Sequence, residues 1–104
     1  MYIGNLKPPK FRISDYHRRK ANRLNVNINY SKDPAKKLDV FKNGKKIASI
    51  GASGYWDFIS YLKAEAEGKF PKGHAEKRRK LYHIRHSKDN KPGTAGYYAL
   101  NILW

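Results

Sequence analysis

The clearest hydrophobic pattern begins at residue 24. Over residues 24–31, Val26, Ile28 and Tyr30 point one way and three asparagines point the other. A period of two is typical of a strand with one buried face. Asp33-Pro34 breaks the alternation, so the strand ends before it.

Residues 37–50 indicate a hairpin. Two strand-like runs flank Asn43-Gly44, a pair that favours a type I′ turn because both turn residues need a positive φ. With residues 24–31 they predict a three-stranded antiparallel meander. In a two-residue turn register, Val40 faces Ile47 and Phe41 faces Lys46.

Beyond residue 54 the hydrophobic spacing favours helices. Asp57 or Ser53 is the expected start of a first helix, which ends near Gly68. Residues 75–87 predict a second helix, and Thr94 is a fair N-cap for a third. The apolar stripe of the second helix would consist of Leu81, Tyr82 and Ile84. The predicted fold class is therefore α+β: a small antiparallel β-meander (about 24–50) packed with two or three short helices (about 55–104).

The first 23 residues are expected to form an extended basic arm that reaches away from a single α+β domain, residues 24–104. Pro8 and Pro9 disfavour a helix. Ser14 and Asp15 are suited to cap a short helix within this arm.

Charge narrows the range of partners. The chain has 104 residues, a net charge of +15 and no cysteine. Residues 1–32 carry eight Lys or Arg against one acid, residues 33–73 eight against five, and residues 74–104 seven against two. Self-repulsion of this size destabilises a small domain unless an acidic partner is near. We therefore expect the chain to bind a polyanion or an acidic protein surface, using the basic ends.

Other function classes are disfavoured. Without cysteine there is no disulfide and no cysteine-based zinc site, and His83 and His86 lack nearby carboxylate ligands, so no metal or other cofactor is expected. Glu65 and Glu67 lie on different helix faces, and no nucleophile elbow or phosphate-binding loop is present. We expect no catalytic residue, no small-molecule substrate and no enzyme. The N-terminal sequence has no signal-peptide pattern, and no apolar run approaches a membrane span, so we expect synthesis in the cytoplasm and no membrane insertion.

Two basic runs are the candidate contacts for a polyanion or an acidic partner. Their residues are Arg12, Arg18, Arg19, Lys20 and Arg23 near the start, and Lys77, Arg78, Arg79, Lys80 and Arg85 in the second predicted helix. Trp104 ends an apolar segment and is expected to dock onto the core or a partner. The aromatic residues considered for stacking on bases are Tyr16, Tyr55, Trp56 and Tyr82.

Three stretches together resemble a known family. They are residues 49–58 (SIGASGYWDF), 78–86 (RRKLYHIRH) and 93–104 (GTAGYYALNILW). In this order, after a hairpin, they resemble a group of small basic proteins of giant, nucleocytoplasmic large DNA viruses. The resemblance covers about residues 38–104. It implies a viral origin and a fold, and it transfers no catalytic or binding residue.

The expected function follows from the charge and this resemblance. The leading hypothesis is a non-enzymatic virion structural protein, a minor capsid or cement component that contacts other capsid proteins on the inner side of the shell. The alternative is a protein that neutralises the DNA or RNA backbone without reading its sequence. A third hypothesis is a host-interaction factor that enters the nucleus through residues 77–80.

Overall fold

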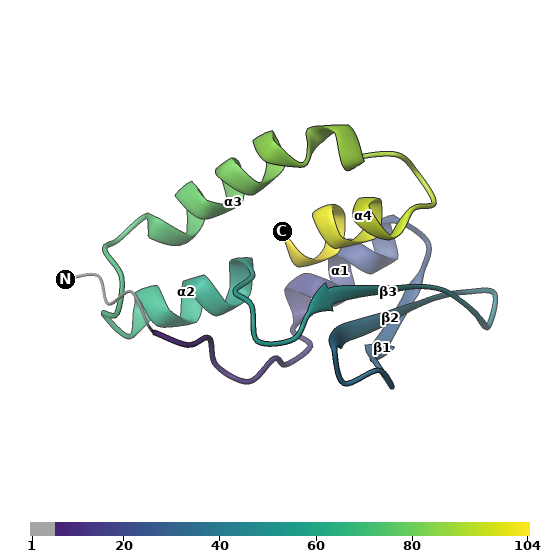
Figure 1. Cartoon of the computed structure of the whole chain (residues 1–104), viewed down its shortest axis with the longest axis horizontal. Helices are drawn as coiled ribbons and strands as arrows, with labels where there is room; N and C mark the ends of the chain where they lie inside the picture. Colours follow the sequence, from purple (N-terminus) through teal and green to yellow (C-terminus); the bar gives the residue numbers. More distant parts are fainter. Residues whose placement is uncertain (1–5) are drawn as a thin grey trace.

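The computed structural model describes residues 6–104 and confirms the α+β class (Figure 1). The elements in chain order are α1 (Asp15–Arg23), β1 (Asn27–Tyr30), β2 (Lys36–Lys42), β3 (Lys45–Ala52), α2 (Phe58–Ala66), α3 (His74–Arg85), the 3-10 turn η1 (Ser87–Asp89), α4 (Ala95–Tyr98) and its π-helical continuation η2 (Ala99–Leu103).

The predicted meander is confirmed. The three strands pair antiparallel in the order β1-β2-β3. Asn43 and Gly44 have φ angles of 53° and 78°, as the type I′ turn requires.

The expected hairpin register is only half right. Phe41 pairs with Lys46, but a bulge follows and Val40 pairs with Ala48 instead of Ile47. The bulge shifts one strand by a residue, and such a shift turns a side chain to the other face of the sheet. Ile47 is consequently 39% exposed.

The three predicted helices are present, with Asp57 as the N-cap of α2 and Thr94 as the N-cap of α4. The N-terminus of α3 has no side-chain cap of its own. Glu65 of α2 replaces it, because its carboxylate accepts hydrogen bonds from the backbone N–H groups of Gly73 and Ala75 at 2.9 and 2.8 Å. These bonds fix α3 beside α2.

The predicted inner face of α3 is wrong in part. Ala75 is buried and Tyr82 packs on the core, whereas Leu81 is 38% and Ile84 70% exposed. Ala75 and Tyr82 are seven residues apart, two turns of helix, and so share one face. That face meets the other helices, and it leaves Leu81 and Ile84 on the outer side.

The C-terminal helix, α4 and η2, lies at the centre of the molecule, between α3 and the sheet (Figure 1). Leu100, Ile102 and Leu103 are at most 3% exposed. The ring of Trp104 stacks on that of Tyr82, with 4.3 Å between centroids, and is 8% exposed. The expectation that Trp104 docks onto a partner is therefore wrong, because its ring is buried in the chain's own core.

The expected arm is also corrected. Residues 15–23 form α1, whose N-cap is Ser14 as predicted, and α1 buries His17 and Ala21 against the core. Residues 6–14 have no helix or strand and pass beneath α2 toward the sheet (Figure 1). The backbone N–H of Ile13 donates to the Tyr30 hydroxyl at 3.1 Å. The described part of the arm thus belongs to the domain, and residues 1–5 lie outside the described residues.

Candidate polyanion-binding groove between α1 and α3

A row of side chains on α1 forms one wall of a groove. These side chains, Tyr16, Arg19, Lys20 and Arg23, are spaced i, i+3, i+4 and i+7, so they lie on one face of the helix. The other wall comes from α3, which contributes Glu76 and Arg79, and Phe58 of α2 completes a hollow of about 400 Å³. The groove therefore brings together residues from both basic runs of the sequence.

Positive charge dominates the groove. Burial lowers the pKa of Lys20, and the nearby guanidinium groups of Arg79 and Arg23 lower it further. This shift is expected when like charges lie close together. The described residues form no ion pair with Arg19, Lys20 or Arg23.

Glu76 is the single carboxylate that lines the groove. It forms an ion pair with the guanidinium group of Arg79 on its own helix, and that hydrogen bond lowers the pKa of Glu76. The same guanidinium lies 5.5 Å from the centre of the Phe58 ring. Arg79 is thus held in place by two contacts.

An aromatic anchor holds α1 in position. The Tyr16 hydroxyl donates to the carbonyl oxygen of Trp104 at 2.9 Å and accepts from the Lys20 ammonium group at 3.2 Å. The Tyr16 ring also packs 5.3 Å from that of Phe58. These contacts tie the cationic wall to the C-terminus of the chain.

The remaining predicted basic residues lie elsewhere. Arg18 is exposed on the opposite face of α1, and Arg12 is exposed on the extended segment. The guanidinium group of Arg78 lies 5.6 Å from the centre of the Tyr61 ring. Lys77, Lys80 and Arg85 are exposed on α3 and do not line the groove. The sequence missed Tyr16, Phe58 and Glu76 as groove residues, although the spacing of Tyr16 with the α1 cations was a usable signal.

Three of the four candidate stacking aromatics, Tyr16, Trp56 and Tyr82, are partly buried and pack against the core. Trp56 stacks on Tyr61 at 4.8 Å and Tyr82 stacks on Trp104, while Tyr16 is held by its hydroxyl. Tyr55 is 70% exposed, and of these four it alone presents most of its ring to solvent.

Among residues 6–104 no three His, Cys, Asp or Glu side chains gather as a metal site. His86 instead lies 2.9 Å from Asp89, between Nδ1 and Oδ2, and stacks on Tyr82. No helix in the described part of the chain has the length and apolar character needed to cross a bilayer.

Comparisons with models of protein families, with curated proteins and with solved structures give no match for this chain. The resemblance to proteins of giant DNA viruses therefore remains a prediction.

Proposed function

We propose that this protein binds the nucleic-acid backbone without reading base sequence, through the groove between α1 and α3. One observation carries the proposal: four cations from two distant basic runs, Arg19, Lys20, Arg23 and Arg79, line one groove that contains a single carboxylate. Phosphate contacts by such side chains supply most sequence-independent affinity.

Arginine favours phosphate as the ligand. Three of the four groove cations are arginines, and the planar guanidinium group binds phosphate oxygens in pairs. The described part of the arm and the apolar C-terminal segment, two features that a capsid contact would use, are part of the chain's own fold. The arginines of the groove and the place of these two segments within the fold support nucleic-acid binding more than a capsid contact.

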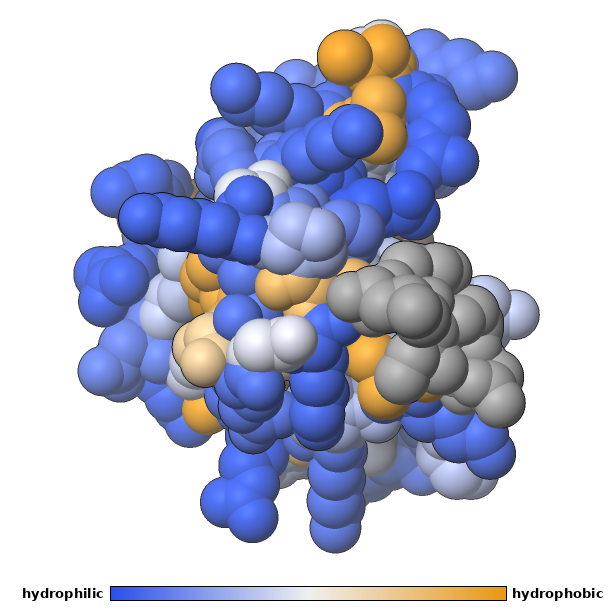
Figure 2. Space-filling model, turned by 90° about the vertical axis from the view of Figure 1, so that its left-hand side faces the viewer, coloured by the Kyte–Doolittle hydropathy of each residue, from blue (hydrophilic) through white to orange (hydrophobic). Residues whose placement is uncertain are grey.

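One observation supports the virion role as a second candidate. Leu81 and Ile84 are exposed on α3, on the helix that also carries the exposed cations Lys77, Lys80 and Arg85. Figure 2 shows a small hydrophobic patch at the top of the molecule, the side where α3 lies in Figure 1, on an otherwise mostly hydrophilic face. A cationic surface with an apolar centre suits an acidic segment of a capsid protein.

The salt dependence of binding tests the main proposal. The logarithm of the DNA-binding constant should fall linearly with the logarithm of salt concentration, with a slope of about 0.9 for each phosphate contact. The triple variant R19Q/R23Q/R79Q should reduce that slope by about 0.9 for each phosphate that it no longer binds.

The control removes the same charge elsewhere. Lys42, Lys45 and Lys46 are exposed on the β2–β3 hairpin, and the triple variant K42Q/K45Q/K46Q should retain the wild-type slope. Equal slopes for the two triple variants would show that total charge, and not the groove, determines binding. Binding to an acidic capsid protein but not to DNA would support the second candidate.

A further inference from the structure

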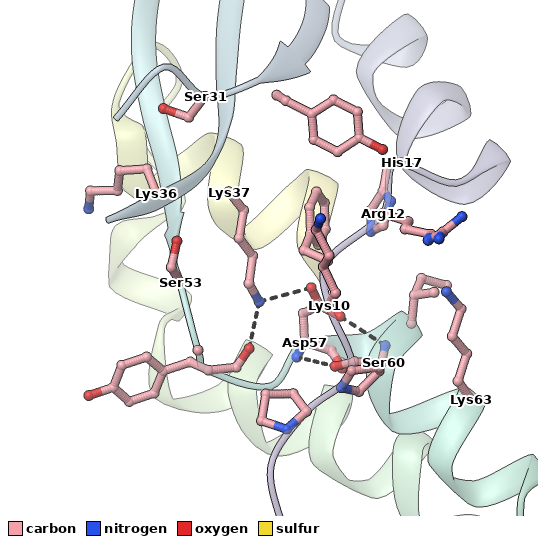
Figure 3. Close-up of a pocket in the computed structure, with 17 residues that line it drawn as sticks. Lys10, Arg12, His17, Ser31, Lys36, Lys37, Ser53, Asp57, Ser60 and Lys63 are labelled. Carbon is pink, nitrogen blue, oxygen red and sulfur yellow. Dashed lines mark hydrogen bonds and ion pairs between the residues drawn. The ribbon is translucent and has the colours of Figure 1, made fainter. Parts of the chain in front are cut away.

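A second hollow lies on the side of the molecule where residues 8–12 cross β2 and α2 (Figure 3). Its volume is about 350 Å³, within the usual range for small-molecule sites, about 300–1,000 Å³. Its walls come from residues 8–12, 30–37, 53–57 and 59–63, together with His17 of α1. We call it the strap pocket, after the extended segment that borders it.

Positive charge surrounds the strap pocket. Its cationic side chains are Lys10, Arg12, Lys36, Lys37 and Lys63. Its one carboxylate, Asp57, is already paired: the Lys37 ammonium group lies 3.0 Å from Oδ2, and the backbone N–H of Ser60 donates to Oδ1. Figure 3 shows Lys36 on one side of this pair and Arg12 and Lys63 on the other. The described residues provide no ion pair for these three cations, so an anion in the pocket meets uncompensated positive charge.

Aromatic rings also border this pocket. Tyr55 is 70% and Tyr30 52% exposed, and both are among the few large apolar side chains that the fold leaves in water. The half-buried Phe11 ring lies 6.3 Å from that of Tyr30, edge to face. Exposed rings beside cations suit a ligand that combines a flat ring with negative charge.

The inner wall contains an unsatisfied donor. His17 is 0% exposed, and its Nδ1 accepts a hydrogen bond from the backbone N–H of Ser14 at 3.0 Å. Burial lowers the pKa of His17 to about 4, so at neutral pH the ring is uncharged and its proton is on Nε2. Nε2 is buried without a hydrogen-bond partner among the described residues, and Figure 3 shows His17 reaching from α1 toward Arg12. Buried donors of this kind are normally paired.

We propose that the strap pocket binds a nucleobase that carries a phosphate. In this arrangement the base packs against Tyr55 and the phosphate lies beside Lys36, which pairs with Ala52 on the segment that leads to Tyr55. Such a ligand comes from one of two sources: a free nucleotide, or an unpaired nucleotide of a strand bound in the α1–α3 groove. Only the second source rests on the proposed function.

An amide NMR titration of the full chain with adenosine monophosphate tests the proposal. We expect saturable shifts at residues 10–12, 30–37, 53–57 and 60–63, and weaker binding of adenosine alone and of inorganic phosphate alone. Tyr55→Ala should weaken nucleotide binding about tenfold, because stacking on one aromatic ring contributes on the order of 1–3 kcal/mol. Lys36→Gln should weaken it to a similar degree.

Matched controls are available in the chain. Ile84 has the same exposed fraction as Tyr55, 70%, so Ile84→Ala removes an equally exposed apolar side chain at a distant place. Lys45→Gln is the charge control for Lys36→Gln. Both controls should bind the nucleotide as the wild type does. Absence of saturable shifts at millimolar nucleotide, or equal affinities for the Tyr55→Ala and Ile84→Ala variants, would overturn the proposal.

A second experiment distinguishes the two sources of the ligand and keeps the test independent of the proposed function. The groove variant R19Q/R23Q/R79Q should bind adenosine monophosphate normally and lose affinity for a single strand. A single strand with the fluorescent base 2-aminopurine at its end then reports whether a base of the strand enters the pocket. If the wild type quenches this fluorescence, and Tyr55→Ala binds the strand without quenching it, the strand is a source of the ligand. If the wild type leaves the fluorescence of the strand unchanged but binds adenosine monophosphate, the ligand of the pocket is the free nucleotide.

Discussion

The α1–α3 groove and the strap pocket both contain an acid–base pair, yet the two pairs are placed very differently. In the strap pocket the side chains of Lys37 and Asp57 are 7% and 3% exposed. In the groove the side chains of Arg79 and Glu76 are 33% and 44% exposed. A buried pair that loses one member leaves a costly unpaired charge, whereas an exposed pair contributes little to stability. The comparison therefore separates charge that holds the fold together from charge that is available to a ligand.

Breaking each of the two pairs should produce the largest difference between these regions in the free energy of unfolding. Asp57→Ala removes the partner of Lys37 and the N-cap of α2, so we expect a loss of about 3–5 kcal/mol in the free energy of unfolding. Glu76→Ala should cost less than about 1 kcal/mol. Urea denaturation measures both values.

Asp57→Asn serves as the control. An asparagine still accepts the capping hydrogen bond but leaves Lys37 unpaired, so its stability should stay well below that of Glu76→Ala. Similar stabilities for all three variants would contradict the view that the buried pair holds the fold.

The next largest effect is the pH dependence caused by His17 in the wall of the strap pocket. An unfolded histidine has a pKa near 6.5, and burial lowers the pKa of His17 to about 4, with Lys37, Lys63 and Lys20 adding to the shift and Asp57 opposing it. As the pH falls, the unfolded chain takes up the proton first. Stability is therefore complete above pH 6.5 and decreases by about 3 kcal/mol between pH 6.5 and 4.

His17→Gln isolates this contribution. Glutamine preserves an acceptor for the Ser14 N–H, as in an ordinary capping box, and does not titrate. Because burial also lowers the pKa of His74 and His83, the measured quantity is the difference between the two stability curves. If the two curves ran parallel from pH 7 to 4, His17 would not be the titrating group.

Gly51 lies beside the strap pocket, and a substitution there tests the packing around Lys37 without altering the charge of Lys37. Gly51 has a φ of 77°, and an added Cβ would lie 2.7 Å from Leu103 Cδ1 and 3.0 Å from Lys37 Cδ. Gly51→Ala should cost about 2–4 kcal/mol, from overpacking and backbone strain together.

Gly54 lines the same pocket, has a φ of 84° and has open space around it. Gly54→Ala should therefore cost only about 1–2 kcal/mol, the strain alone. Thermal unfolding of the two variants gives the comparison, and equal shifts would show that crowding against Leu103 and Lys37 is unimportant.

The smallest effect is expected at the groove pair. Glu76→Gln removes the single carboxylate of the groove and should strengthen DNA binding a few fold while stability changes by less than about 1 kcal/mol. Fluorescence anisotropy at fixed salt measures the affinity. A weaker complex would mean that Glu76 positions Arg79 for binding phosphate.

Much of the fold could be predicted because its signals are local. Alternation at Val26 and Ile28, the Asn43-Gly44 turn and the caps Ser14, Asp57 and Thr94 act over a few residues. The bulge beside Val40 and the outward position of Ile84 could not be predicted, since strand pairing and neighbouring helices decide them.

The sites depend on contacts between distant segments. The basic residues of the groove were named from the sequence, but their convergence requires α1 and α3 to pack around the C-terminal helix. The strap pocket has walls from residues 8–12, 30–37, 53–57 and 59–63 and from His17, and no single stretch carries a signal for it.

The most direct test of the central claim is the reactivity of individual lysines, measured by acetylation and mass spectrometry with and without DNA. Lys20 lines the groove, whereas Lys42, Lys45 and Lys46 are exposed on the hairpin. We predict that DNA protects Lys20 and leaves the three hairpin lysines as reactive as before. Protection of the hairpin lysines with Lys20 still reactive would contradict the assignment of the α1–α3 groove as the nucleic-acid site.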